Sequence, residues 1–460
     1  MTAGAPAPAG RPFPWTFTAP LLWTTSLNPV NSSIIATSLV AIGTAFGVSA
    51  GQTALLVAAV YVTSAVAQPA MGKLGGAFGP RRVLLGGLAV LVVAGLVGAF
   101  APSFGWLVVS RALVGIGTAA GYPTAMALIR QRADAAGTGI PGSVLGGVSI
   151  AAQVTAAVGL PLGGALMAVW GWPAAFAINI PLGVAGAAMV LAWIPADAPR
   201  ARRSARDLVR ELDPAGLALF AVAVVSLIAV LSDVRSLSWW LVVLFAVAIA
   251  ALIVWERRAA VPFIDVRMLA RNGTLLRTYI RQALALLAAY TVLYGYVQWL
   301  EEGRGLAASV SGLVMLPMSA VAAVCAGVIS RRALIRVPLL ISSGAMILGG
   351  GALLLVGHDT SVAALVALSL MFGLVLGLTS TSNQAALYTQ TSAAGIGVAS
   401  GLLRTSSYLG AILASALIGL AFPARATDAG LHAAAWAIAG VGVLVLLLVA
   451  LDRRLPLRGQ

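Results

Sequence analysis

The chain has 460 residues, of which 60% are hydrophobic and 9% are charged, and its mean hydropathy is +1.00. A soluble domain cannot bury that much apolar surface, so the composition excludes a soluble globular protein and predicts an all-α protein that crosses a membrane many times. The formal charge of +15 does not indicate nucleic-acid binding, because the basic residues form clusters between apolar runs instead of one patch.

Residues 1–18 are rich in Pro, Ala and Gly and carry one charge, which predicts a disordered cytoplasmic tail and not a signal peptide. Fourteen apolar segments follow, each long enough to cross a bilayer as a helix of about 20 residues. They lie at 19–42, 54–72, 83–101, 106–129, 142–168, 174–194, 214–232, 237–255, 279–300, 307–329, 337–356, 361–386, 397–421 and 431–451.

The basic residues divide unevenly between the two sides of this predicted topology. The outer loops would hold only Arg235, Arg304 and Arg425, whereas the tails and inner loops hold most of the others. The positive-inside rule therefore predicts a multi-pass protein of the cell (plasma) membrane with both termini in the cytoplasm.

Two Arg-rich stretches, Pro195–Asp213 and Glu256–Arg281, interrupt the apolar pattern on the cytoplasmic side, and the second is partly amphipathic. The two segments between them are nearly free of polar side chains and are expected to face lipid. The predicted organisation is the tail at 1–18, a six-helix bundle at 19–195, cytoplasmic linkers with two extra helices at 196–278, and a second six-helix bundle at 279–460.

Arg111 lies in a stretch that has no other charge from Val83 to Ile129. A guanidinium in the middle of a membrane costs roughly 3 kcal/mol or more, and it usually lines a wet cavity. The alternative is an arginine that snorkels to the headgroups, because Trp106 lies only about one and a half helical turns away.

Two loops carry similar basic motifs. GKLGGAFGPRR runs from Gly72 to Arg82, where Gly72 and Gly79 would permit a tight turn and Arg81 and Arg82 would anchor it at the inner surface. A weaker echo at Gly327–Arg336 suggests an internal repeat. Chance similarity is the alternative, because orientation alone demands basic inner loops.

Small residues recur on two predicted helices, in RALVGIGTAAGYP and in GLPLGGAL. Glycine lets helices approach closely, and glycine with proline lets a helix bend, so these residues are candidates for gating; packing alone is the alternative. The residues concerned are Gly115, Gly117, Gly159, Pro161, Gly163 and Gly164.

Taken in order, the loop at Gly72–Arg82, the Arg-x-x-x-Gly-x-Gly pattern that begins at Arg111, the Gly/Pro-rich segment and FAINIPLG at Phe176–Gly183 resemble the major facilitator superfamily. The two extra central segments, with ELDPAGLALF at Glu211–Phe220, and QWLEEGRGLAASVSGLVMLP at Gln298–Pro317 resemble its fourteen-helix drug:proton antiporter branch. The resemblance implies two six-helix bundles around a central cavity that opens alternately to each side. It also implies export of small, often hydrophobic compounds, usually in exchange for protons.

The chain departs from the family pattern at several charged positions. Gly76 and Ala77 stand where the loop commonly has an Asp and an Arg, and Asn28 stands where the antiporter branch usually has an Asp. An Arg usual near Ser407 is missing, while Arg404 lies one turn earlier on the same helix face. With Gly76 and Ala77 in these places, the loop lacks two charges of the network that is usual in the family.

All thirteen Asp and Glu residues fall in predicted loops or at helix ends. The predicted cavity therefore holds Arg111 and Arg404 without a counter-charge, unless Glu301 or Glu302 folds inward. Each Asn or Gln in the cavity could instead make an interhelical hydrogen bond. The candidate substrate-binding residues are Asn28, Asn31, Arg111, Gln153, Tyr290, Tyr294, Gln298, Asn383, Gln384 and Arg404.

The favoured function is a secondary active transporter that exports small amphipathic molecules, such as drugs, antibiotics or metabolites, by alternating access. Neutral or anionic substrates are expected, because the cavity would carry arginines without carboxylates. The alternatives are a proton-coupled exporter whose proton carrier is Glu301 or Glu302, a uniporter without proton coupling, and a non-transporting membrane sensor or accessory protein.

An enzyme is not expected, because the predicted membrane region has no cluster of His, Cys or carboxylate side chains. The single Cys325 excludes a disulfide framework, and His358 and His432 lie too far apart in sequence to suggest a metal site. We therefore expect no cofactor. The expected partners are a small-molecule substrate, the lipid bilayer and protons, with no nucleic acid, and the chain is expected to be a monomer.

Overall fold

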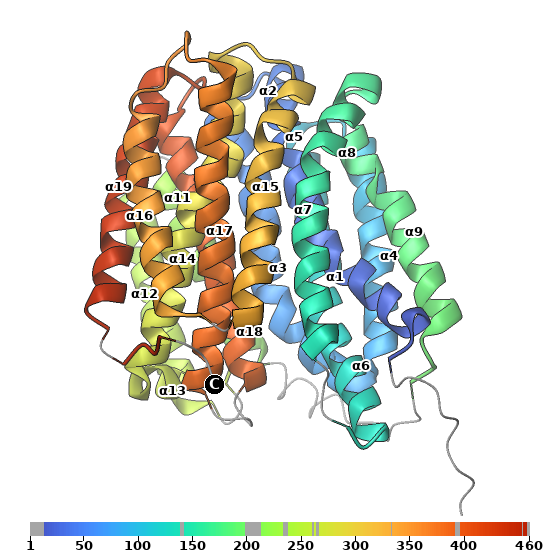
Figure 1. Cartoon of the computed structure of the whole chain (residues 1–460). Helices are drawn as coiled ribbons and strands as arrows, with labels where there is room; N and C mark the ends of the chain where they lie inside the picture. The colour runs from blue at the N-terminus through green and yellow to red at the C-terminus, as the bar shows by residue number, and fades with distance from the viewer. Residues whose placement is uncertain are drawn as a thin grey trace, which may run out of the picture.

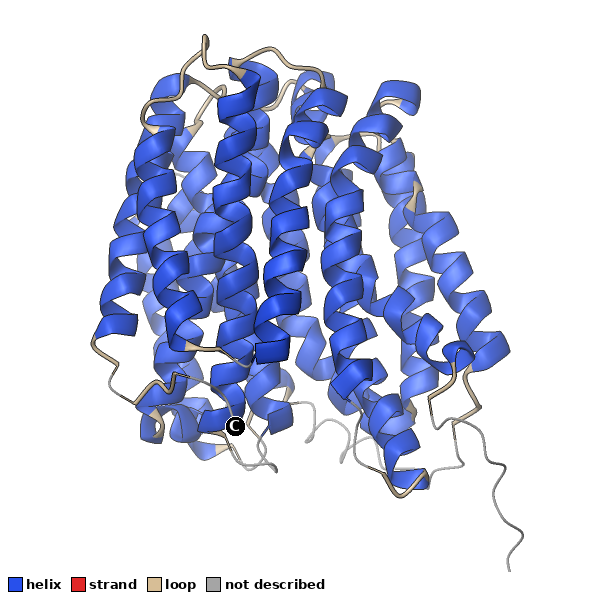
Figure 2. Cartoon of the chain, viewed as in Figure 1, coloured by secondary structure: helices blue, strands red, loops and turns tan. Residues whose placement is uncertain are grey.

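The computed structural model describes residues 13–138, 142–197, 213–232, 238–259, 262–263, 266–332, 334–391, 396–452 and 454–457. These residues form helices joined by short loops (Figure 2). Twelve helices in the described ranges are long and apolar enough to cross a membrane, and a bent pair makes thirteen if it is counted as one span. The prediction of an all-helical membrane protein is confirmed. The predicted count of fourteen spans is not confirmed in the described ranges.

The first group of helices extends to Trp193 and lies on one side of the molecule (Figure 1). Its members are α1 (Trp15–Ala36), α2 (Leu39–Phe46), α3 (Ala50–Phe78), α4 (Pro80–Ala99), α5 (Phe104–Ala119), α6 (Gly121–Ala135), α7 (Gly142–Trp170), α8 (Ala174–Ala177) and α9 (Asn179–Trp193). Helices α5 and α6 together make one span, and α1 and α2 form the bent pair, with 57° between them.

A pair of helices and a short helix precede the second group in the chain. The pair is α11 (Pro214–Ser232) and α12 (Trp239–Arg258), and the short helix is α13 (Val266–Arg271). The group itself comprises α14 (Gly273–Tyr290), the π-helical stretches η1 (Thr291–Tyr296) and η2 (Trp299–Gly303), α15 (Ala308–Arg332), α16 (Arg336–Leu353), α17 (Val362–Gln390), α18 (Ile396–Ala421) and α19 (Asp428–Ala450).

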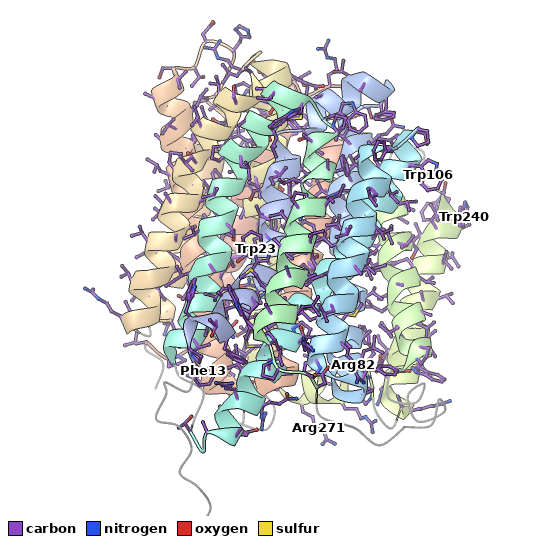
Figure 3. The ribbon with its side chains drawn as sticks, turned by 90° about the vertical axis from the view of Figure 1, so that its right-hand side faces the viewer. Phe13, Trp23, Arg82, Trp106, Trp240 and Arg271 are labelled. Carbon is purple, nitrogen blue, oxygen red and sulfur yellow. The ribbon has the colours of Figure 1, made fainter. Side chains whose placement is uncertain are left out.

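The two ends of the molecule differ in composition. Phe13 lies at the same end as Arg82 and Arg271, whereas Trp106 and Trp240 lie at the opposite end (Figure 3). The C-terminus also lies at the first end (Figure 1). We call the first end the terminal face and the opposite end the distal face.

Several helices begin earlier than the apolar pattern predicts. Helix α1 starts at Trp15 instead of residue 19, so the last part of the predicted tail is helical; residues 1–12 lie outside the described part. Helix α14 starts at Gly273 instead of residue 279, and with η1 and η2 it forms a span of 31 residues to Gly303. Arg277 lies in the part of the helix that the apolar pattern missed, because hydropathy alone assigns an arginine to a loop.

The predicted turn at Gly72–Arg82 is wrong in extent. Helix α3 continues through Phe78, and Gly79 alone, with φ of +106°, joins it to α4. Gly72 and Gly75 do not bend the chain but face Pro123 and Thr124 on α6, so their small size serves helix packing.

The start of α4 is capped by a residue distant in sequence. The backbone amides of Arg81 and Arg82 donate to the two carboxylate oxygens of Asp197, at 3.1 and 2.9 Å. The Arg81 guanidinium also donates to the Leu191 carbonyl at 3.0 Å. A carboxylate at a helix N-terminus satisfies free amides and opposes the positive end of the helix dipole. Asp197 therefore brings negative charge to the N-terminus of α4.

Replacement of Gly79 by Ala is expected to destabilise the protein by about 1 kcal/mol or more, because an L side chain is unfavourable at positive φ. Gly76→Ala is the matched control: it lies three residues earlier, within α3 and in open space, and should be neutral or slightly stabilising. Thermal unfolding of both variants in detergent tests this difference. Equal melting temperatures would contradict the assigned backbone conformation.

Candidate functional site

A cavity of about 230 Å³ lies between the two groups of helices. Its lining comes from α1, α6 and α7 of the first group and from α14, η1, α15, α17 and α18 of the second. The lining residues are Asn28, Pro29, Ser32, Ser33, Tyr122, Ala152, Ala156, Gln282, Leu286, Tyr290, Leu293, Met318, Ser319, Leu376, Ser380, Gln384, Leu403, Arg404, Ser407 and Tyr408.

Arg404 is the charged residue of this lining, which contains no Asp or Glu among the described residues. Its guanidinium carbon lies 4.4 Å from the centre of the Tyr122 ring. Tyr122 belongs to α6 and Arg404 to α18, so this cation–π contact joins the two groups across the cavity. Tyr290 and Tyr408 also interact electrostatically with Arg404 and surround it with aromatic surface.

The amides near the cavity are held by hydrogen bonds within each group. Asn28 donates to the hydroxyls of Ser64 and Thr118, at 3.3 and 3.0 Å. On the other wall, Gln282 donates to the Ser407 hydroxyl at 3.0 Å. The cavity walls are thus preorganised by bonds that do not cross between the groups.

A layer of tyrosines closes the cavity on its distal side. The Tyr61 hydroxyl lies 2.8 Å from the Tyr294 hydroxyl and 2.8 Å from the Ser32 hydroxyl. Tyr290 stacks on Tyr294 with ring centres 5.8 Å apart and an interplanar angle of 10°. Because Tyr61 belongs to α3 and Tyr294 to η1, their hydrogen bond links the two groups of helices.

The helix backbones approach closely on the distal side of that layer. A side chain at Gly164 of α7 would collide with the backbone of Ser309, at the distal end of α15. Gly51 of α3 lies against Gly419 of α18, and the amide of Ala50 donates to the Ala424 carbonyl at 3.3 Å. The cavity lining lies instead in the middle and in the terminal halves of its helices, as Gln384 on α17 and Arg404 on α18 illustrate.

Arg111 lies outside the cavity lining. It is 1% exposed, and its Nε donates to the Leu56 carbonyl at 3.1 Å. Its guanidinium interacts electrostatically with Tyr61 and Tyr294, so it lies against the tyrosine layer and not in the lipid headgroups. Its Nη2 has no hydrogen-bond partner within the described residues.

The structure gathers only some of the predicted binding residues. Asn28, Tyr290, Gln384 and Arg404 line the cavity. The remaining described candidates do not: Asn31 donates to the Leu27 carbonyl, Tyr294 belongs to the closing layer, Gln298 donates to Thr53, and Asn383 donates to Gln282 behind the wall. The side chain of Gln153 lies outside the described residues.

The predicted gating glycines lie at helix contacts. Gly115 faces α3, Gly117 faces α4, and Gly159 and Gly163 face α1 on either side of Pro161. These contacts fit the packing alternative, because a β-carbon at any of the four glycines would collide with backbone or side chains. Gly164 differs from them, since its contact is with the other group of helices.

The sequence analysis did not single out several lining residues. Tyr122 follows the glycine pattern of α6, and Tyr408 lies one turn after Arg404, so helical spacing from Arg404 was an available signal for Tyr408. Gln282 lies near the start of the predicted span 279–300, next to the charged Arg281, and was not singled out as a candidate. No group of three or more His, Cys, Asp or Glu side chains that could hold a metal occurs in the described ranges.

Comparison with known proteins agrees with this architecture. A model of the Major Facilitator Superfamily matches residues 21–415. The chain is 32% identical to the uncharacterized MFS-type transporter YwoD of Bacillus subtilis over 413 residues, which cover 88% of this chain and 89% of YwoD. It is 29% identical over 352 residues to the multidrug resistance protein Stp of Mycobacterium tuberculosis, covering 74% of this chain and 63% of Stp.

A solved structure from work on proton-dependent oligopeptide transporters has the same fold, with a TM-score of 0.65 at 15% identity over 95% of this chain and 96% of that one. The family match and the relatives indicate a transporter of small molecules with multidrug-efflux relatives, and not an enzyme. The chain is thus a multi-pass membrane protein that belongs to the major facilitator superfamily.

Proposed function

We propose that this transporter exports small amphipathic molecules by alternating access, and that its described conformation loads substrate from the cytoplasm. The observation that carries the proposal is the cavity shared by the two bundles, whose distal side is closed by the tyrosine layer. Export of drugs or antibiotics is the proposed role, in line with the multidrug-resistance relative.

The proposed topology has the terminal face in the cytoplasm. The positive-inside rule supports it, because Arg82 and Arg271 lie at that face and Trp106 and Trp240 lie at the other (Figure 3). Fourteen spans result if α1 and α2 count as one span and α11 as another. Helices α11 and α12 contact each other and would be the extra pair of the fourteen-helix drug:proton antiporter branch. The two six-helix bundles would then occupy 19–195 and 279–460.

A cysteine at the cavity tests the direction of opening. In a Cys325→Ser background, Gln384→Cys should react with a membrane-impermeant maleimide in inside-out vesicles and be protected in intact cells, because its access lies on the cytoplasmic side. Leu355→Cys, which is 86% exposed beyond the distal end of α16, should give the opposite pattern. Labelling of Gln384→Cys from outside the cell alone would contradict the proposed state.

The proposed substrates are neutral or anionic. Arg404 supplies positive charge to the lining, and no described lining residue supplies negative charge. Tyrosines and Met318 provide polarisable apolar surface for an aromatic or aliphatic body. The membrane potential would assist export of an anion by about 2.3 kcal/mol per charge and 100 mV.

Removal of the Arg404 charge should change charge selectivity. Arg404→Ala is expected to reduce export of the anionic probe pyrenebutyrate on the order of tenfold more than export of its neutral amide, because one close charge is lost. Arg404→Lys keeps the charge and should retain most of this preference. Efflux measured by pyrene fluorescence in vesicles gives the ratio, and an equal loss for both probes would exclude a role for the charge.

Proton coupling through Glu301 is a second element of the proposal. Glu302 accepts a hydrogen bond from the Ala426 amide at 2.6 Å and thus has a structural partner. Glu301 Oε1 is inaccessible to solvent and has no hydrogen-bond partner within the described residues. Glu301 lies three residues after Gln298 in a π-helical stretch, a conformation often found at functional sites. A carboxylate in such surroundings suits reversible protonation.

Replacement of each glutamate by glutamine distinguishes the role of Glu301 from that of Glu302. Glu301→Gln should abolish probe accumulation driven by a pH gradient while keeping exchange without a gradient, because only the coupling group is lost. Glu302→Gln is the matched control and should remain coupled. Transport in inside-out vesicles with and without a protonophore measures both. Gradient-driven transport that survives in both variants would favour uniport or another proton carrier.

A further inference from the structure

A buried ion pair lies at the terminal face of the second bundle. Nη1 of Arg281 lies 3.3 Å from Oδ2 of Asp452, and both side chains have no solvent exposure. Arg281 belongs to α14, whereas Asp452 follows the end of α19. The sequence places Asp452 directly after the last predicted span, 431–451, whereas the structure buries its side chain within the bundle.

The segment around Asp452 is itself held against the bundle. The Arg454 amide donates to Oδ1 of Asp452 at 3.3 Å, and Leu455 is buried in the main hydrophobic core. The Ile335 amide, just before α16, donates to the Leu457 carbonyl at 3.1 Å. These contacts hold the Asp452 carboxylate in a fixed position.

Hydrogen bonds connect this ion pair to the cavity wall. Arg281 Nε donates to Oδ1 of Asn383 at 3.3 Å, and Asn383 donates to Oε1 of Gln282 at 3.0 Å. Gln282 in turn donates to Ser407 at 3.0 Å, and both of these residues line the cavity. Arg281 consequently lies directly behind the cavity wall that Gln282 and Ser407 form. Arg404 belongs to the same wall, three residues before Ser407 on α18.

A guanidinium without solvent needs a compensating charge, and removal of its partner leaves that charge uncompensated. Arg277 also lies near Asp452, with 3.4 Å between its Nε and Oδ2 of Asp452, but its side chain is 39% exposed, so water also solvates its charge. Asp452 is thus the group that neutralises Arg281.

We propose that Asp452 is a positioning residue that determines charge selectivity, because it neutralises Arg281 behind the wall and leaves Arg404 as the charged side chain of the cavity lining among the described residues. The inference rests on the proposed function, since it requires that substrate occupies this cavity. Asp452 does not touch substrate; it acts through Arg281, Asn383 and Gln282.

The test compares pyrenebutyrate with its neutral amide in vesicles that contain the full chain. Asp452→Asn should lower KM for the anion and leave KM for the amide unchanged, which raises the anion-to-amide ratio of kcat/KM. Two unit charges roughly 10 Å apart at an effective dielectric of about 20 alter a binding constant on the order of tenfold. The double variant Arg281→Gln with Asp452→Asn removes both charges and should return the ratio to that of the wild type.

Arg281→Gln alone provides an independent readout, because it leaves the Asp452 carboxylate with only the partly exposed Arg277. The anion-to-amide ratio should then fall below that of the wild type, so the inference stays testable if Asp452→Asn does not fold. A purely structural role predicts equal losses for both probes and no restoration in the double variant; that result would overturn the inference. Wild-type protein that exports neither probe would overturn the proposed function itself.

Discussion

Positive charge buried in an apolar environment is the constraint on which this architecture depends. Arg281, Arg404 and Arg111 lie within membrane-spanning helices, away from the helix ends, and each is stabilised differently. Arg281 is paired with Asp452, Arg404 lies over the ring of Tyr122, and Arg111 bonds to the Leu56 carbonyl beside two tyrosine hydroxyls. The carboxylate of Asp452 neutralises Arg281, which lies behind the cavity wall. The ring of Tyr122 stabilises Arg404 without neutralising it, so the charge of Arg404 remains available to a ligand.

In the proposed transport cycle, the distal contacts between the two groups of helices must break when the cavity opens to the other side. The Tyr61–Tyr294 hydrogen bond and the glycine contacts of α7 with α15 and of α3 with α18 join the bundles without ion pairs. Such contacts act only at short range. When they form again, no charged group has to lose its hydration. The bonds within each bundle, such as those of Asn28 and Gln282, would persist when the bundles move relative to each other. This separation suits rigid-body alternation.

The site was predictable from the sequence only in part. Asn28, Tyr290, Gln384 and Arg404 were found because polar residues are rare in apolar segments and therefore conspicuous. Arg111 was equally conspicuous, yet rotation of α5 places it against the tyrosine layer instead of in the cavity. Gln282 and Asp452 were missed because they lie at the ends of predicted spans, next to Arg281 and Arg453, where charged and polar residues are common.

The sequence by itself determined the class of protein, since only helices can bury an apolar chain of this composition in lipid, and its motifs indicated the family. Hydropathy counts residues along one chain, so it could not give helix rotation or contacts across the bundles. Only the tertiary structure decided that Gly79 alone forms the turn after α3, that Asp197 caps α4, and that Asp452 compensates Arg281. The physical reason is that each of these roles depends on a partner distant in sequence, which composition and periodicity do not encode.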